Sequence, residues 1–316
     1  MMMELLMEEV LMEEYPEREP DIITKKLVRI PSSSSSLFFE IPSMVPTSIP
    51  IKKVKSEINC QESSENVPKI IFIVPYRDRE HHLIYFKSQM EKILSGQQDY
   101  KIYYIHQCDT RPFNRGAMKN IGFLMVKEKY PESYKNITLV FNDVDTTPSD
   151  TGIIPDYATK PRIVKHFYGY TYALGGIISI TAGDFESING FPNYWAWGYE
   201  DNMLNHRVVV SGLTLDRSVF YSITDNRIKQ FKTGPERIVN RGEFQRFMSR
   251  VKEGIKCIKN LTYIINEETG FVDVTRFETG FECRNDLNQS FQAINTNAPF
   301  HIGRSGSRRC TMNLNI

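Results

Sequence analysis

Short apolar runs alternate with helical patterns in the middle of the chain. The runs KIIFIVP, KIYYIHQ and ITLVF, at residues 69–75, 101–107 and 137–141, are typical of strands. Between them, apolar side chains recur at helical spacing, first at Leu83, Phe86, Met90 and Ile93 and then at Met118, Ile121 and Met125. This order predicts an α/β fold with right-handed crossovers and an open, mostly parallel central sheet.

Further elements are predicted downstream. GGIISIT at 175–181 is a predicted strand, and a helix is expected to begin around Glu200 and to end near Gly212. Residues 236–260 are basic and are predicted to be helical. The stretch LTYIINEETGFVDV at 261–274 is typical of a β-hairpin.

The two ends of the chain differ from the part between them. Residues 1–20 carry seven Glu and one Arg, which interrupt every apolar run, so we expect neither a signal peptide nor a membrane span. The Ser- and Pro-rich stretch 31–50 is typical of a linker. We predict a poorly ordered segment at 1–66, a globular domain at 67–280 and a polar extension at 281–316. A cytoplasmic location is the direct expectation.

Charge and cysteine content narrow the range of partners. The chain has 39 Lys and Arg against 38 Asp and Glu, whereas binding to nucleic acid or an anionic membrane needs a dense basic face. The five cysteines include no CxxC pair, so free thiols are expected rather than a cysteine-based structural zinc site. A local site must therefore carry the function.

Polar residues follow two of the predicted strands at their carboxyl ends, where ligands of such sheets bind. Asn142, Asp143 and Asp145 follow the third strand, and both aspartates project to one side of an extended segment. Oxygen ligands of this kind suit Mg²⁺ or Mn²⁺, which can bridge the phosphates of a nucleoside diphosphate. An acidic turn without a metal is the alternative.

Arginines and an aromatic ring follow the first strand in PYRDRE, residues 75–80. Arg77 and Arg79 could bind a diphosphate through their planar forks, and Tyr76 could stack on a base or a sugar. Arg115 lies at a predicted helix start, where backbone N–H groups also favour an anion. The alternative is a solvated helix start with arginines paired to neighbouring acids.

The stretch WAWGYEDN at 195–202 contains the only two Trp of the chain, followed by paired acids. Trp faces favour sugar rings, and a carboxylate at a helix start can accept a hydroxyl proton as a general base. The alternative is a core Trp pair followed by an acidic helix N-terminus.

Taken together, VPYRDREHHL (74–83), FNRGAMKNIGF (113–123), FNDVDTTP (141–148) and GG…INGFPNYWAWGYEDN (175–202) resemble the β-1,4-galactosyltransferase family. The four motifs stand in the family's order, and the resemblance covers about 210 residues. It implies a nucleotide-diphospho-sugar transferase fold (GT-A, Rossmann-like) with a central mixed sheet. It also implies inverting transfer of a hexose, galactose or N-acetylgalactosamine, from a UDP-sugar to a hydroxyl of a glycan or glycoconjugate.

The resemblance also implies roles for individual residues. The donor would be held by a set drawn from all four motifs: Pro75, Tyr76, Arg77, Arg79, Arg115, Asp143, Val144 and Trp197. Asp145 would be a ligand of Mn²⁺, with Mg²⁺ as the alternative. Glu200 would bind the donor sugar and Asp201 would be the catalytic base. Asp201 would also contact the acceptor, together with Trp197, Gly198 and Asn202.

Several positions depart from the family pattern. Ala196, Tyr199, Asn202 and Met203 interrupt the motif that the family writes as Trp-Gly-Trp-Gly, Glu and several Asp. Ser222 and Thr224, with Asp225 adjacent, stand where the family supplies histidine to the metal. The tyrosine that tunes donor choice corresponds to Ala173 or, with a shift of one residue, to Tyr172. A catalytically silent sugar- or nucleotide-binding protein on the same fold is therefore the alternative function.

Overall fold

The computed structural model describes residues 67–97, 99–233, 237–290, 300–303 and 309–312. The predicted acidic segment and linker at 1–66 lie outside the described residues, and so does half of the predicted extension at 281–316. The domain boundaries at 67 and 280 stay predictions.

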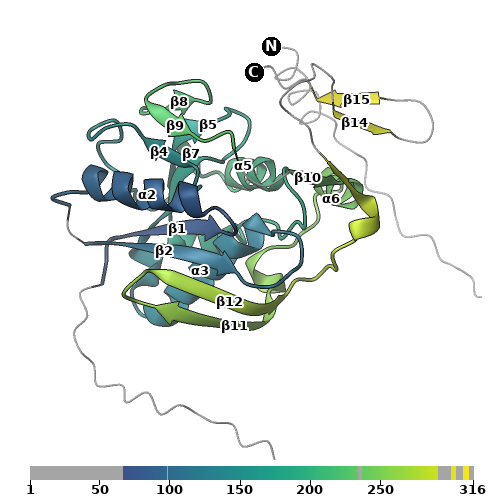
Figure 1. Ribbon diagram of the computed structural model, residues 1–316, viewed down its shortest axis with the longest axis horizontal. Helices are drawn as coiled ribbons and strands as arrows, with labels where there is room; N and C mark the ends of the chain where they lie inside the picture. Colours follow the sequence, from purple (N-terminus) through teal and green to yellow (C-terminus); the bar gives the residue numbers. More distant parts are fainter. Residues whose placement is uncertain (1–66, 98, 234–236, 291–299, 304–308, 313–316) are drawn as a thin grey trace, which may run out of the picture. The chain divides into compact units, whose positions relative to one another are not determined.

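A mixed sheet dominates the fold, with the strand order β11-β12-β2-β1-β3-β6-β5-β7, and β8 pairs with β5 (Figure 1). The first strands are β1 (Ile70–Tyr76), β2 (Tyr100–Gln107) and β3 (Thr138–Asn142), where prediction placed them. β1 pairs in parallel with both β2 and β3. β2 therefore lies on one side of β1 and β3 on the other, which makes β1 a switch point of the sheet. A crevice at the carboxyl ends of strands at such a switch point is where α/β sheets bind ligands.

Two helices cover opposite faces of this part of the sheet, α2 (Glu80–Ile93) and α3 (Arg115–Lys129) (Figure 1). Successive side chains of β1 point to opposite faces, because a strand has a period of two. Ile71 and Ile73 therefore join one core cluster, which contains the buried residues of α3. Phe72 and Val74 join the other, which contains those of α2.

The second half of the sheet is mixed, because β5 pairs antiparallel with β6 and in parallel with two short strands. Its strands are β5 (Ile163–Gly169), β6 (Ile177–Thr181), β7 (Thr214–Asp216) and β8 (Tyr221–Ser222). β6 is the strand predicted at 175–181, and it pairs antiparallel with both β3 and β5. Between these strands lie α4 (Ala182–Ser187) and α5 (Glu200–Val210), and α5 begins at the predicted residue.

The predicted hairpin is present as β11 (Lys259–Asn266) and β12 (Phe271–Glu278). Its second strand extends the sheet by pairing in parallel with β2, a contact that the sequence pattern did not indicate. The short elements β4 (Thr146–Pro148) and β9 (Ile228–Gln230) form a separate antiparallel pair. Two further pairs are β10 (Ile238–Asn240) with β13 (Asn288–Ser290) and β14 (Phe300–Gly303) with β15 (Arg309–Met312).

The prediction of a helix over 236–260 is wrong for most of that range. Only α6 (Arg241–Met248) is α-helical, between β10 and the short 3-10 helix at Ile255–Cys257. Asn240 caps α6 through its side chain, which accepts from the N–H groups of Gly242 and Glu243. Gly254 packs so closely on Asn189 that an added Cβ would lie 1.9 Å from the Asn189 carbonyl oxygen. These tertiary contacts outweigh the helix propensity of the basic residues.

Candidate active site

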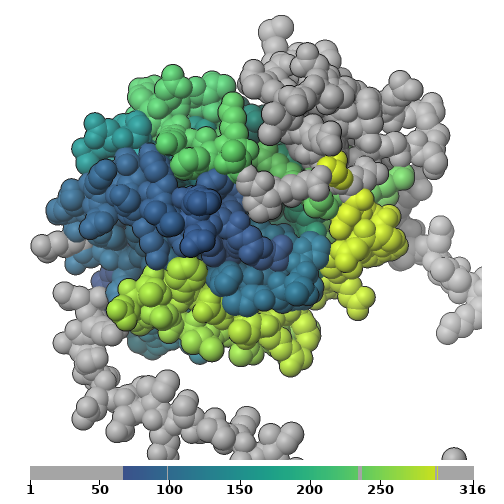
Figure 2. Space-filling model, in the orientation of Figure 1, coloured from purple at the N-terminus to yellow at the C-terminus, as the bar shows by residue number. Residues whose placement is uncertain are grey.

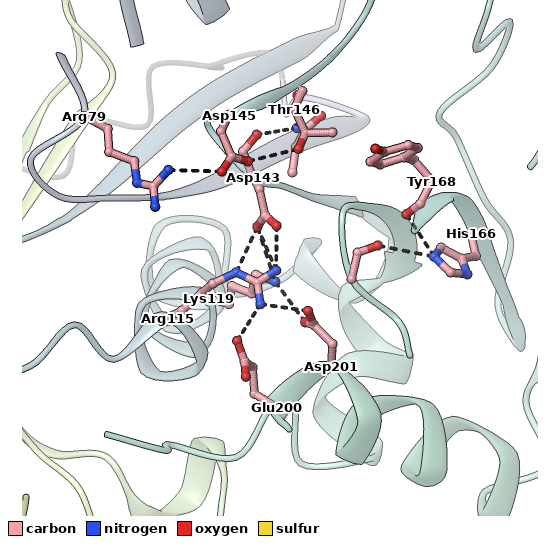
Figure 3. Close-up of polar contacts among 12 residues, drawn as sticks. Arg79, Arg115, Lys119, Asp143, Asp145, Thr146, His166, Tyr168, Glu200 and Asp201 are labelled. Atoms are coloured by element: carbon pink, nitrogen blue, oxygen red, sulfur yellow. Dashed lines mark hydrogen bonds and ion pairs between the residues drawn. The ribbon is translucent and has the colours of Figure 1, made fainter. Parts of the chain in front are cut away.

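All four sequence motifs contribute to one cluster at the carboxyl end of β3 (Figure 3). Asp143 and Asp145 follow β3, Arg115 opens α3, and Glu200 and Asp201 open α5. Arg79, at the start of α2, joins the cluster through Asp145. The elements that carry these residues come from both sides of the β1–β3 switch point, which explains why their side chains converge.

Arg115 lies at the centre of this cluster, in contact with three carboxylates. Its guanidinium donates to Asp143 in a fork, with Nε 3.0 Å from Oδ1 and Nη2 2.7 Å from Oδ2. Nη1 donates to Glu200 Oε1 at 2.5 Å and to Asp201 Oδ2 at 2.8 Å. An arginine bound in this way links the acidic motif after β3 to the acidic start of α5.

A buried amide network fixes the start of α3. The Asn114 side chain accepts from the Ala117 N–H at 2.9 Å as the helix cap and donates to the Asn193 carbonyl at 3.0 Å. The Asn120 amide donates to the Asn193 side-chain oxygen at 2.9 Å. The helix that carries Arg115 is thereby joined to the segment that precedes the two Trp residues.

Lys119 belongs to the same cluster, although sequence analysis did not single it out. Its side chain is only 2% exposed, and its ammonium nitrogen lies 3.4 Å from Asp201 Oδ1 and 3.8 Å from Asp143 Oδ1. The ammonium also lies 4.5 Å from the centre of the Phe191 ring. Lys119 follows Arg115 by four residues, which places both on one face of α3. That spacing is the signal from which it could have been found.

Burial and neighbouring charges act against one another on the carboxylates of this cluster. Burial favours protonation of Asp143, but Arg115 and Lys119 outweigh it and lower its pKa. Burial raises the pKa of Glu200 despite the adjacent Arg115, and Asp201 adds to the rise. Glu200 Oε2 is buried and finds no hydrogen-bond partner among the described residues. An unpaired buried oxygen of this kind is suited to a ligand hydroxyl.

Asp145 faces away from Arg115, toward Arg79 and Thr146 (Figure 3). Its carboxylate accepts from Arg79 Nη1 at 3.1 Å and from the Thr146 hydroxyl at 3.0 Å. Burial raises the pKa of Asp145, and so does the neighbouring charge of Asp143. A divalent cation would relieve that repulsion between the two aspartates.

The residues around Asp145 fit a hard cation only in part. Among the described residues, Asp145 belongs to no close group of three or more His, Cys, Asp or Glu side chains. Ser222 and Thr224 are exposed, and Asp225 pairs with Arg227 at 2.7 Å. Asp145 therefore offers one oxygen ligand, and donor phosphates or water would have to supply the others.

Tyr76 and Arg77 lie apart from the cluster, on the side of β1 that faces β2. The Tyr76 ring packs edge-on against His106 and Phe271 at 5.4 and 5.5 Å. Arg77 donates to the Arg111 carbonyl at 2.5 Å and lies over the Phe113 ring. Pro75 is buried, and Val144 packs in the core beside α2, so the Val144 side chain is directed into the protein.

The two Trp residues have different surroundings. Trp195 is buried, and its ring nitrogen donates to the Phe281 carbonyl at 2.9 Å. Trp197 is 39% exposed and is followed by Gly198, which has φ +103°. Tyr199 also has a positive φ, +71°, and its buried ring stacks on Phe247 of α6 at 5.1 Å. A rigid anchor therefore follows the exposed Trp197.

The turn before β6 closes the cluster on another side. Gly175 packs so tightly on Asp201 that an added Cβ would lie 2.3 Å from its Oδ2. The Leu174 N–H donates to the Asp201 carbonyl at 3.0 Å. Asn202 donates to the Tyr172 carbonyl at 3.5 Å, and the neighbouring Ala173 is buried. Both candidates for the donor-tuning position thus lie next to the start of α5.

Two sequence profiles match this chain. The N-terminal region of glycosyl transferase group 7 matches residues 49–154, and the N-terminal domain of galactosyltransferase matches residues 162–233. Mouse β-1,4-galactosyltransferase 1 is 35% identical over 158 residues, covering 47% of this chain and 39% of that protein. Human β-1,4-galactosyltransferase 2 is 30% identical over 220 residues, covering 65% and 58%. The chain spans about half the length of these relatives.

Solved structures share the fold. The catalytic domain of Drosophila β-1,4-galactosyltransferase 7 with xylobiose superposes with a TM-score of 0.51 at 20% identity, covering 70% of this chain and 97% of that one. A mutant of the same fly enzyme, solved with manganese, UDP-Gal and xylobiose, gives 0.50 at 22% identity with the same coverage. The predicted GT-A-like fold is thereby confirmed.

The described residues contain no helix long and apolar enough to cross a membrane, and the cytoplasmic location stays a prediction. The two profiles match consecutive parts of the chain that contain all of the cluster around Arg115. The predicted family is confirmed: this chain belongs to glycosyltransferase group 7, the β-1,4-galactosyltransferase family.

Proposed function

We propose that this protein is an inverting glycosyltransferase that moves galactose or N-acetylgalactosamine from a UDP-sugar to a hydroxyl of a glycan or glycoconjugate. The observation that carries the proposal is the contact of Arg115 with Asp143, Glu200 and Asp201 at the switch point of the sheet. Arg115 can bind a ligand in a bidentate manner. It contacts both Glu200, the carboxylate proposed to bind the donor sugar, and Asp201, the candidate base.

The donor would bind by exchanging partners with Arg115. A guanidinium fork suits phosphate oxygens as well as carboxylates, so a diphosphate can replace one of its three carboxylates. The free Oε2 of Glu200 would then accept from a hydroxyl of the donor sugar, which gives this buried oxygen a partner. Arg79, Tyr76 and Arg77 remain candidates for the nucleotide part of the donor.

Asp201 is the proposed base. Its carboxylate would take the proton of the acceptor hydroxyl while that oxygen bonds to the anomeric carbon and the bond from this carbon to UDP breaks. Attack from the side opposite to UDP inverts the configuration. Gly175 leaves room for this carboxylate, and a side chain at that position would collide with it.

Asp145 would hold a Mn²⁺ or Mg²⁺ ion. The site brings together three cations, Arg79, Arg115 and Lys119, and four carboxylates, Asp143, Asp145, Glu200 and Asp201. A donor diphosphate would add further negative charge, and a divalent cation would compensate it as UDP leaves. The fly enzyme with the same fold was solved with manganese and UDP-Gal, so these are the first ligands to test.

A catalytically silent binding protein is the second candidate. It is favoured by the pairing of both Asp201 oxygens with cations, Arg115 at 2.8 Å and Lys119 at 3.4 Å. A carboxylate held in this way offers the acceptor hydroxyl only its remaining lone pairs. The serine and threonine in place of the family's histidines point in the same direction.

A hydrolysis screen separates the two functions without knowledge of the acceptor, because water can replace an acceptor slowly. UDP-galactose, UDP-N-acetylgalactosamine and UDP-glucose are each incubated with the protein, with and without Mn²⁺, and the release of UDP is measured. We expect release from one of the first two that increases with Mn²⁺. Binding in calorimetry without release from any donor would overturn the enzyme and favour the silent binder.

A further inference from the structure

A second group of polar side chains lies at the far side of β1 from the proposed active site. His106 is near the end of β2, Cys108 follows two residues later, and Asp273 lies on β12. His106 Nδ1 is 2.9 Å from Asp273 Oδ1 and 3.5 Å from the Cys108 sulfur. The sulfur lies 3.9 Å from the same Asp273 oxygen. Three different kinds of metal-ligand atom therefore lie close to one another.

The three separations suit a tetrahedral ion. With bonds of about 2.3 Å to sulfur and about 2.0–2.1 Å to nitrogen or oxygen, tetrahedral ligand atoms lie about 3.3–3.6 Å apart. The observed distances of 2.9, 3.5 and 3.9 Å bracket that range, so shifts of a few tenths of an ångström would complete the geometry. No local sequence motif indicates this group, because Asp273 is 165 residues from Cys108.

The backbone holds the three ligands in place. Asp273 lies directly opposite His106 in the parallel pairing of β12 with β2, and the Cys108 N–H donates to the Val274 carbonyl at 3.0 Å. The His106 ring packs edge-on against the Tyr76 and Phe271 rings, which limits its rotation. The ligands thus belong to strands and to a hydrogen-bonded strand end, which makes the group largely preformed.

The site is open to solvent on one side. Cys108 is exposed, and the His106 and Asp273 side chains are 30% and 45% exposed. The space-filling view shows the yellow-green hairpin β11–β12 at the surface, against the blue part of the chain (Figure 2). An ion can therefore enter, and water can complete its coordination.

We propose that His106, Cys108 and Asp273 form a binding site for a thiophilic divalent cation of the zinc class. Sulfur, imidazole and carboxylate together favour Zn²⁺ over Mn²⁺ or Mg²⁺, which prefer oxygen ligands. The site is separate from Asp145, because β12 and β3 are three strand spacings apart, roughly 14 Å. A bound ion would tie the hairpin β11–β12 to the end of β2, next to Tyr76.

Cobalt binding to the full chain, without an affinity tag of histidines, tests the proposal. Co²⁺ bound to a thiolate in a tetrahedral site absorbs in the near ultraviolet and the visible, and Zn²⁺ should displace it. We expect one equivalent of Co²⁺ to bind with this spectrum and Zn²⁺ to raise the melting temperature. Cys108→Ala and His106→Asn should each weaken binding at least tenfold, with the matched control Cys283→Ala unchanged.

Alkylation gives a second readout that does not depend on how well the variants fold. Iodoacetamide should modify the exposed Cys108 of the unchanged protein, and Zn²⁺ should slow that modification at least tenfold without protecting Cys283. Asp145→Asn should leave the cobalt spectrum intact. A cobalt spectrum that survives Cys108→Ala, or alkylation of Cys108 at the same rate with and without Zn²⁺, would overturn the proposal.

Discussion

Two buried charge clusters in this protein have similar composition and different settings. The Arg115 cluster comprises Arg115, Lys119, Asp143, Glu200 and Asp201, and the Arg246 cluster comprises Arg207, Glu243, Arg246 and Glu253. In the second, Arg246 pairs with both glutamates and lies over the Phe281 ring, 3.9 Å from its centre. Arg207 donates to the carbonyls of Gly190 and Glu253. The charged side chains of the Arg246 cluster thus pair with one another inside the protein.

The difference lies in which groups a ligand can reach. Glu243 and Glu253 are 5% and 1% exposed, whereas Asp143 and Asp201 are 20% and 21% exposed. The Arg246 cluster is closed and joins α6 to the segment before η2 (Ile255–Cys257). The Arg115 cluster keeps one side open, at Asp143 and Asp201. Among the described residues, buried atoms without a hydrogen-bond partner occur in both clusters, Glu200 Oε2 in one and both carboxylate oxygens of Glu253 in the other, so they do not distinguish the two. Buried charge alone therefore does not identify an active site, and accessible partners are needed as well.

Removal of Arg246 should have the largest effect on stability. Arg246→Leu leaves Glu243 and Glu253 buried without their cation, which we expect to cost about 3–5 kcal/mol of unfolding free energy. Urea unfolding followed by circular dichroism measures it. Arg284→Leu is the control, because its ion pair with Asp286 is exposed and should contribute about 0–1 kcal/mol. Equal losses in the two variants would show that the Arg246 cluster is not a structural element.

Glu253 of the Arg246 cluster should make the stability of the protein depend on pH. Burial raises the pKa of Glu253 to about 7, and Glu243 adds to the rise. The folded state then keeps a proton that the unfolded chain has lost, so stability falls between about pH 4.5 and about pH 7 and is level above. At about 1.4 kcal/mol per pKa unit the loss is about 3 kcal/mol.

The test of this slope is urea unfolding at a series of pH values. Glu253→Gln has no proton to lose and should flatten the curve in that window. Glu268→Gln, at an exposed position of the β11–β12 turn, should leave it as it is. If the curves of the unchanged protein and of Glu253→Gln have the same slope, Glu253 is ionised in the folded state.

In the Arg115 cluster, the bidentate guanidinium of Arg115 should determine the affinity for the donor. Arg115→Lys keeps the charge and loses the bidentate geometry, so we expect UDP to bind about 10–100-fold more weakly. Calorimetry in the presence of Mn²⁺ gives the dissociation constant. Arg276→Lys, at an exposed arginine, is the matched control. Unchanged UDP affinity in Arg115→Lys would place the diphosphate elsewhere.

The smallest effect is expected for Lys119. Lys119→Met keeps the buried shape of the side chain and removes the cation between Asp143 and Asp201, which should lower kcat about tenfold. Lys127→Met lies on the same helix and removes a more exposed ion pair, with Glu186, so it should leave kcat unchanged. A reduced melting temperature with normal kcat in Lys119→Met would make this lysine a structural residue.

Much of the Arg115 cluster could be predicted because its residues follow strands or open helices at local sequence motifs. Arg115, Asp143, Glu200 and Asp201 were all proposed for one site, and the fold brings them into contact. Lys119 was missed because its role depends on Asp143 and Asp201, which come from other motifs, and only its spacing of four from Arg115 indicated it locally. The Arg246 cluster was missed for a different reason, because the helix predicted over 236–260 is interrupted by the cap at Asn240 and the close packing of Gly254.

The most direct test of the central claim is the turnover of Asp201→Asn. The substitution keeps the size of the side chain and removes its ability to accept a proton at neutral pH. UDP release from the donor found in the hydrolysis screen is measured with Mn²⁺, alongside circular dichroism and UDP binding. We predict a loss of about 10²–10⁴-fold in kcat, with the fold and UDP binding retained. Turnover close to that of the unchanged protein would contradict the role of the Arg115 cluster as the catalytic centre.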